Sequence, residues 1–249
     1  YDSSVDYAKL SGTKITVAAS PTPHAEILNA AKDELAEKGI KLDIVEFTDY
    51  VQPNLATESG DLDANYFQHI PYLESFNKEQ GTHLVNAGGI HYEPFGIYPG
   101  TKNDLSKVEK GDVIAVPNDT TNEARALLLL QDNGIITLKD GAGLEATVND
   151  IAENPKKLEI IELEAAQLPR SLDDVTISVI NAGYAKSANL DSKKALATED
   201  NTSPYVNIIA AREQDKDNPT YQKFVKIFQS DNVRKYINDN FSDGLVPAF

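Results

Sequence analysis

The sequence contains no cysteine, no methionine and no tryptophan. Without cysteine the chain cannot form a disulfide, a Cys-ligated zinc or iron–sulfur centre, or a cysteine nucleophile. Basic residues are also scarce, because 23 lysines and arginines stand against 39 acidic residues and give a formal net charge of −16. This excess of acidic residues argues against a nucleic-acid partner, since binding to a phosphate backbone relies on clustered Lys and Arg.

Sequence motifs for catalysis are missing as well. There is no GxSxG elbow, no HExxH zinc motif, no GxxxxGKS/T phosphate loop and no GxGxxG dinucleotide fingerprint. The four histidines, His24, His69, His83 and His91, are scattered, and we interpret His83 and His91 as solvated or capping residues. We therefore predict no metal, no cofactor and no enzymatic activity. The alternative is an enzyme in which His69 and a neighbouring aspartate act as an acid–base pair.

The chain reads as alternating strands and helices after a polar, aperiodic leader of thirteen residues, which we expect to be flexible. No apolar stretch approaches the roughly 20 residues that a membrane-spanning helix requires. Strand 14–19, a helix ended by Gly39 and strand 41–47 form a βαβ unit. Thr120 and Glu123 form a capping box at the start of another helix. Further strands are predicted at 61–68, 112–118, 157–164, 175–185 and 203–212. This alternation over 249 residues predicts two α/β lobes.

Aromatic residues gather in one part of the sequence, from Tyr50 to Tyr72. Phe67 and His69 lie between these two tyrosines, at the end of a predicted strand, where α/β proteins commonly bind ligands. Such rings could form the walls of a pocket for a small, partly apolar molecule. Ordinary core packing explains the same cluster equally well.

The segment PNDTTNEAR places Asn122 and Arg125 three residues apart, on one face in the first turns of a helix. Free N–H groups at the helix N-terminus and a nearby guanidinium together favour binding of a carboxylate. The alternative is a surface arginine that pairs with an Asp or Glu of the chain. Two further polar residues, Asn181 and Asn207, lie in apolar runs, where a buried amide serves either as a structural clamp or as a ligand contact.

Five segments resemble one known family in order: PTPHAEIL, DANYFQHIPYL, EPFGIYP, PNDTTNEARALLLLQ and SPYVN. They resemble the methionine-binding lipoproteins (NlpA/MetQ-like) of ABC importers, and the match extends from about Lys14 to Phe249. One departure is Phe95, where EPMG is the more usual family sequence. The resemblance implies a two-lobed periplasmic-binding-protein fold (type II-like), with two mixed, mostly parallel sheets and a ligand cleft between the lobes.

The same resemblance implies domain boundaries and residue roles. One lobe would comprise residues 14–97 plus 207–249 and the other 98–206, with 1–13 as the remnant of a tether. By this likeness, the walls of the side-chain pocket would be Tyr50, Phe67, His69 and Tyr72. Asn122 and Arg125 would bind the carboxylate of the ligand. The amides of Asn181 and Asn207 would complete recognition of the backbone end of the ligand.

The function implied by the resemblance is capture of L-methionine, or of a relative such as D-methionine or a methionine-containing dipeptide. The ligand would then be delivered to an ABC permease and its ATPase. Another amino acid, or an enzyme on the same scaffold that acts on a small carboxylate, is the alternative. We expect an extracytoplasmic monomer, attached to the membrane by an N-terminal lipid anchor that this chain lacks.

Overall fold

The computed structural model describes residues 13–200, 204–242 and 244–249. The expected tether lies outside these residues except for Thr13, which begins the first strand. The chain divides into two compact units. The first extends to Glu93 and resumes at Pro204, and the second runs from Pro94 to Ser203.

The first unit contains a six-stranded sheet in the order β13-β4-β12-β3-β1-β2. Strand β1 pairs in parallel with β2 and β3, whereas β12 runs antiparallel to both β3 and β4. The strands are β1 (Thr13–Ala19), β2 (Ile40–Glu46), β3 (Ala64–His69), β4 (Leu84–Tyr92), β12 (Val206–Arg212) and β13 (Val246–Pro247).

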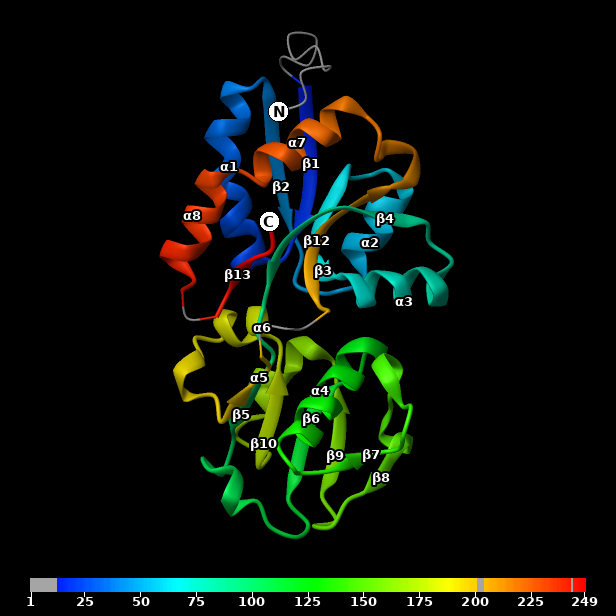
Figure 1. Ribbon diagram of the computed structural model, residues 1–249, viewed down its shortest axis with the longest axis vertical. Helices are drawn as coiled ribbons and strands as arrows, with labels where there is room; N and C mark the ends of the chain where they lie inside the picture. Colours follow the sequence, from blue (N-terminus) through cyan, green and yellow to red (C-terminus); the bar gives the residue numbers. More distant parts are fainter. Residues whose placement is uncertain (1–12, 201–203, 243) are drawn as a thin grey trace. The chain divides into compact units, whose positions relative to one another are not determined.

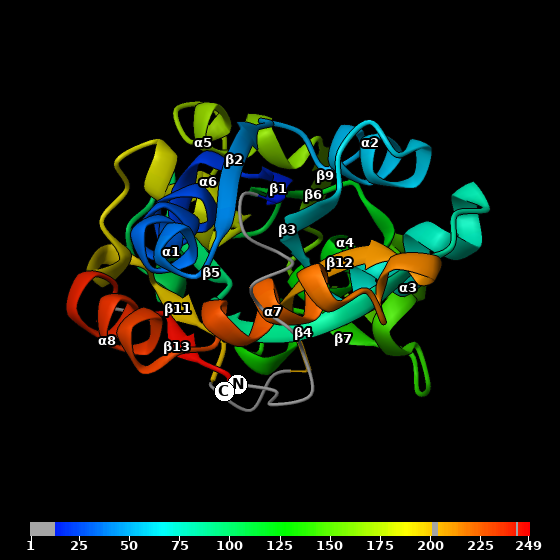
Figure 2. The same cartoon turned by 90° about the horizontal axis from the view of Figure 1, so that it is seen from above.

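Helices cover both faces of this sheet, and the alternating side chains of β12 show how. Ile209 and Ala211 pack with α1, α7 and α8, while Ile208 and Ala210 pack with Leu73 of α3 on the other face. Both views show α1 and α8 side by side, away from α2 and α3 (Figures 1 and 2). The helices are α1 (Glu26–Glu37), α2 (Gln52–Ser59), α3 (Ile70–Gln80), α7 (Pro219–Phe228) and α8 (Asp231–Asn240).

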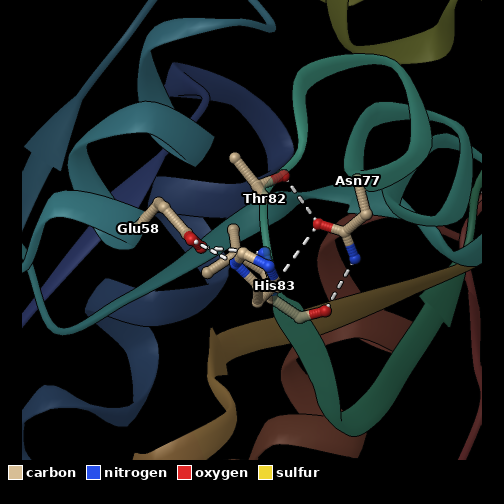
Figure 3. Close-up of polar contacts among 5 residues, drawn as sticks. Glu58, Asn77, Thr82 and His83 are labelled. Carbon is tan, nitrogen blue, oxygen red and sulfur yellow. Dashed lines mark hydrogen bonds and ion pairs between the residues drawn. The ribbon is translucent and has the colours of Figure 1, made fainter.

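The turn from α3 into β4 is held by side-chain hydrogen bonds (Figure 3). Thr82 Oγ1 donates to Asn77 Oδ1 at 2.7 Å, and Asn77 Nδ2 donates to the carbonyl of Leu84 at 2.8 Å. The imidazole of His83 is 77% exposed and lies 2.9 Å from Glu58, which agrees with its interpretation as a solvated residue. Partial burial opposes ionisation of Glu58, but hydrogen bonds from His83 outweigh it and lower the pKa of Glu58.

The second unit contains a five-stranded sheet in the order β11-β5-β10-β6-β9. Strand β6 runs parallel to β9 and β10, and β5 runs antiparallel to β10 and β11. Its elements are β5 (Gly96–Pro99), β6 (Val113–Pro117), α4 (Thr120–Asp132), β9 (Glu159–Leu163), α5 (Leu168–Ser171), β10 (Ile177–Ile180), α6 (Ala182–Ser187) and β11 (Ala197–Thr198), with a separate pair of short strands, β7 (Thr137–Leu138) and β8 (Ile151–Glu153).

The α/β class and the mixed sheets are confirmed, with three differences in detail. Antiparallel pairs outnumber parallel ones in the two main sheets, because β5 and β12 each run antiparallel to both of their neighbours and β13 pairs antiparallel with β4. The strand predicted over 175–185 ends at Ile180, where Asn181 becomes the N-cap of α6. Asp119, not Thr120, caps α4. No helix in the described part of the chain has the length and hydropathy needed to cross a bilayer.

Candidate ligand-binding residues

Four of the predicted residues meet at the junction of β3 and α3 in the first unit. The rings of Tyr50, Phe67 and Tyr72 lie 5.9 Å apart, centroid to centroid, for each pair. Tyr72 donates its hydroxyl hydrogen to the carbonyl of Tyr50 at 2.6 Å, which fixes the loop before α2. The three rings also belong to a small hydrophobic cluster with Phe76. The cluster therefore packs as a core and provides a rigid aromatic surface at the same time.

His69 ends β3 and is the N-cap of α3. Its Nδ1 accepts a hydrogen bond from the backbone N–H of Tyr72 at 3.0 Å, so the ring proton is on Nε2. The imidazole also packs edge-on against Tyr205, with centroids 4.9 Å apart. These contacts orient the ring from two sides, and 6% of the residue remains exposed.

Asn207, in β12, pairs with His69 of β3 and with His91 of β4 across the sheet. Its side-chain Oδ1 lies 2.8 Å from Nε2 of His24. Because β1 and β3 are parallel, His24, which follows β1, and His69, at the end of β3, belong to the same edge of the sheet. Asn207 stands at this edge because β12 begins there.

In the second unit Asn122 and Arg125 lie in the first turns of α4, as predicted. Asp119 accepts hydrogen bonds from the backbone N–H of Asn122 at 3.3 Å and from its Nδ2 at 2.7 Å. Both predicted residues are buried, Asn122 to 2% and Arg125 to 4% exposure. The interpretation of Arg125 as a surface arginine is therefore wrong.

Arg125 nevertheless has the acidic partner that this interpretation required. Its Nε lies 2.9 Å from both carboxylate oxygens of Glu199, and its Nη2 lies 2.5 Å from Oε1. Glu199 also accepts the backbone N–H of Phe95 at 3.0 Å, and the guanidinium stacks 4.7 Å from the Phe95 ring centroid. Phe95 thus packs directly against the predicted carboxylate-binding residue. The methionine that is usual in the family at this position could also pack there, but it has no aromatic face for the guanidinium.

Asn181 follows β10, which is parallel to β6, so it belongs to the same sheet edge as the start of α4. Its Oδ1 is buried and has no hydrogen-bond partner among the described residues. A buried acceptor left without a donor costs about 1–3 kcal/mol, and such atoms are typical of sites that a ligand completes. Asn181 thus offers a buried acceptor that the described residues leave unused.

The described residues also include a buried polar cluster that the sequence patterns do not predict. His24, His91 and Glu93 each place a potential ligand atom within 4.8 Å of the others. His91 is fully buried, so its interpretation as a solvated or capping residue is wrong. The missed signal is the spacing of His91 and Glu93, because residues two apart in an extended strand share a face.

Charges within this cluster follow from burial and hydrogen bonding. Burial opposes ionisation of Glu93, but the interaction with His24 and the hydrogen bonds from both histidines hold the pKa of Glu93 well below its usual range. Burial lowers the pKa of His91 and, with the nearby Glu93 charge, raises the pKa of Tyr66 well above its usual value. Glu93 is therefore a carboxylate, His91 is neutral and Tyr66 keeps its proton.

The chain forms two α/β units, and the second unit is inserted between the two segments of the first. This arrangement defines the two-lobed fold of periplasmic solute-binding proteins. In each unit the predicted residues lie at one edge of the sheet. Residues 15–249 match the NlpA lipoprotein family, and the chain belongs to this family.

Named relatives agree with this assignment. The D-methionine-binding lipoprotein MetQ of Escherichia coli is 48% identical over 222 residues, which is 88% of this chain and 81% of that protein. The protein of the same name from Yersinia pestis is 42% identical over 96% of this chain and 95% of its own length. A nutrient-binding protein from Burkholderia cenocepacia, solved bound to methionine, is 49% identical with a TM-score of 0.91, over 94% of this chain and all of that one.

Proposed function

We propose that this protein is the solute-binding component of an ABC importer and captures L-methionine or a close relative, such as D-methionine or a methionine-containing dipeptide. It delivers the ligand to the permease and its ATPase and performs no chemistry on it. The proposal rests on the family membership of the chain, together with a relative that was solved bound to methionine and that matches nearly the whole chain. The family's lipoprotein name supports an extracytoplasmic, lipid-anchored location, and we expect a monomer.

The residues described above supply the chemistry that an amino acid requires. We assign the side chain of the ligand to the rings of Tyr50, Phe67 and Tyr72 together with His69. A thioether gains about 0.3–1.5 kcal/mol from each favourable contact with an aromatic ring. Burial of a methionine-sized side chain contributes roughly 1.5–3 kcal/mol.

We assign the charged end of the ligand to the polar residues of the predicted set. The guanidinium of Arg125, beside Asn122 at the start of α4, suits a carboxylate. Asn207 and Asn181 complete the recognition of the backbone end, and the unpartnered Oδ1 of Asn181 suits the ammonium group. Charge-assisted hydrogen bonds of this kind contribute roughly 1.5–3 kcal/mol each.

Isothermal titration calorimetry with ligand-free protein tests the proposal. The panel contains L-methionine, D-methionine, glycyl-methionine, leucine and glutamine. We expect the methionine compounds to bind at least tenfold more tightly than leucine and glutamine, because those ligands lack the thioether. Binding of leucine or glutamine in place of every methionine compound would assign the protein to another amino acid, and binding of none would refute the proposal.

A further inference from the structure

Asn207 is connected to a buried set of side chains that the proposed function does not use. Nε2 of His24 lies 2.8 Å from Asn207 Oδ1 and 3.0 Å from Glu93 Oε1. Nε2 of His91 lies 2.8 Å from the same Glu93 oxygen, and Nδ1 of His91 is bonded to the hydroxyl of Tyr66. His24 and His91 are 3% and 0% exposed, so water does not compete for these bonds.

The direction of each hydrogen bond in this set can be assigned. Glu93 is ionised and only accepts, so both Nε2 atoms that face it carry a hydrogen. Tyr66 keeps its proton and donates it to Nδ1 of the neutral His91. Because Nε2 of His24 carries a hydrogen, the atom of Asn207 that faces it must be the acceptor, the carbonyl oxygen.

The same three residues could be imagined as a metal site, but the distances favour hydrogen bonds. Ligand atoms about 2.0–2.1 Å from a tetrahedral zinc lie roughly 3.3–3.4 Å from one another, whereas the Nε2 atoms here lie 2.8 and 3.0 Å from Glu93 Oε1. A ligating histidine also normally donates its other ring N–H to a partner, and Nδ1 of His24 is buried without one among the described residues.

We infer that His24, held in place by Glu93, is a positioning residue that fixes the side-chain amide of Asn207 with its carbonyl turned toward His24 and its NH2 group turned toward the ligand. Asn207 then donates a hydrogen bond to the carboxylate of the ligand and does not accept one from its ammonium group. The inference rests on the proposed function, because it concerns the orientation of a residue in that site. It identifies His24 and Glu93 as determinants of ligand selection that have no ligand contact of their own.

The first experiment separates positioning from general destabilisation. His24→Leu removes the donor to Asn207, whereas His91→Leu removes the other donor to the same Glu93 and leaves Asn207 bonded. We expect both variants to unfold at a lower temperature, but only His24→Leu to lose affinity for L-methionine, by about tenfold. His24→Gln places an amide donor near the position of Nε2, and we expect it to recover most of that affinity. Equal loss in His24→Leu and His91→Leu, or no loss in His24→Leu, would overturn the inference.

The second experiment reads the orientation directly with Asn207→Asp, which keeps the shape of the side chain. The aspartate can still accept from His24, but its second oxygen replaces the NH2 group. We expect affinity for L-methionine to fall at least tenfold, while 3-(methylthio)propylamine, which lacks the carboxylate, binds no more weakly than to the wild type. If Asn207→Asp retains L-methionine, the amide faces the ammonium group and the inference is wrong.

Three further outcomes come from the wild-type protein and its comparison with His24→Leu. If it binds no methionine compound, the proposed function fails and the inference fails with it. If it binds methionine while His24→Leu binds equally well, the inference fails alone. Zinc bound in a 1:1 ratio to the purified protein, and lost in His24→Leu, would also refute the hydrogen-bond assignment.

Discussion

The ion pair between Arg125 and Glu199 leads to a prediction about both stability and binding. As a ligand contact alone, Arg125 could be replaced by alanine with little effect on stability. The structure predicts otherwise, because the side chains are 5% and 14% exposed and the guanidinium meets the carboxylate through Nε and Nη2. Removal of one partner from a buried pair costs about 3–5 kcal/mol, since the remaining charge stays buried without compensation.

We therefore expect Arg125→Ala to lower the free energy of unfolding by about 3–5 kcal/mol at pH 7. Loss of the stacking contact with the ring of Phe95 adds to this effect. The assay is urea unfolding followed by circular dichroism. The matched control is the double variant Arg125→Leu with Glu199→Leu, which removes both charges. It should recover most of the lost stability, because replacement of a buried pair by apolar residues is often neutral or stabilising.

Binding by the double variant separates the two roles of Arg125. If Arg125 also receives the ligand carboxylate, the double variant is stable but binds L-methionine at least 100-fold more weakly than the wild type. Wild-type affinity in that variant would make Arg125 a structural residue. A loss of less than 1 kcal/mol in Arg125→Ala, or a double variant no more stable than the single one, would refute the reasoning about the buried pair.

Three further predictions follow from individual side chains. Burial, together with the nearby Glu162, raises the pKa of Glu123 to about 7. Ionised Glu123 therefore destabilises the fold increasingly as the pH rises from 4.5, the ordinary pKa of a glutamate, through 7. Thermal unfolding should show Glu123→Gln to be more stable than the wild type at pH 8, by about 1–2 kcal/mol after solvent screening, and equal at pH 4; a constant difference would contradict the shift. Tyr72→Phe should lower the free energy of urea unfolding by about 0.5–1.5 kcal/mol, through loss of the hydrogen bond to Tyr50, and an unchanged unfolding curve would count against that bond. Asn181→Ala should be at least as stable as the wild type, because it removes a buried acceptor without a partner, yet calorimetry should show weaker binding of methionine; lower stability would mean that the amide is a structural clamp.

The sequence predicted local features well where a pattern within a few residues decides them. The βαβ unit from β1 to β2 and the helix that contains Arg125 were found from hydrophobic spacing and flanking glycines. The predicted cap of that helix is one residue too late, because Asp119 and Thr120 are both good N-caps and only the backbone conformation decides between them.

Contacts between residues distant in the sequence were beyond such patterns. Arg125 and Glu199 are 74 residues apart, and His24 and Asn207 are 183 residues apart. Neither pairing has a local signature. The strand predicted over 175–185 is too long for a related reason, since its apolar run continues past Ile180 while the chain turns into α6. The roles of the eight predicted site residues remain predictions.

The position of β12 in the sheet determines which unit can fold first while the chain is being synthesised. This strand lies between β3 and β4 in the first unit's sheet, yet it begins only at Val206. Until it is present, β3 and β4 both expose an unpaired edge, and such edges favour aggregation. The strands of the second unit's sheet all lie between Gly96 and Thr198 in the described chain, so this unit can fold first as a continuous insertion. A chain that stops before Val206 should therefore contain one finished unit and one aggregation-prone half.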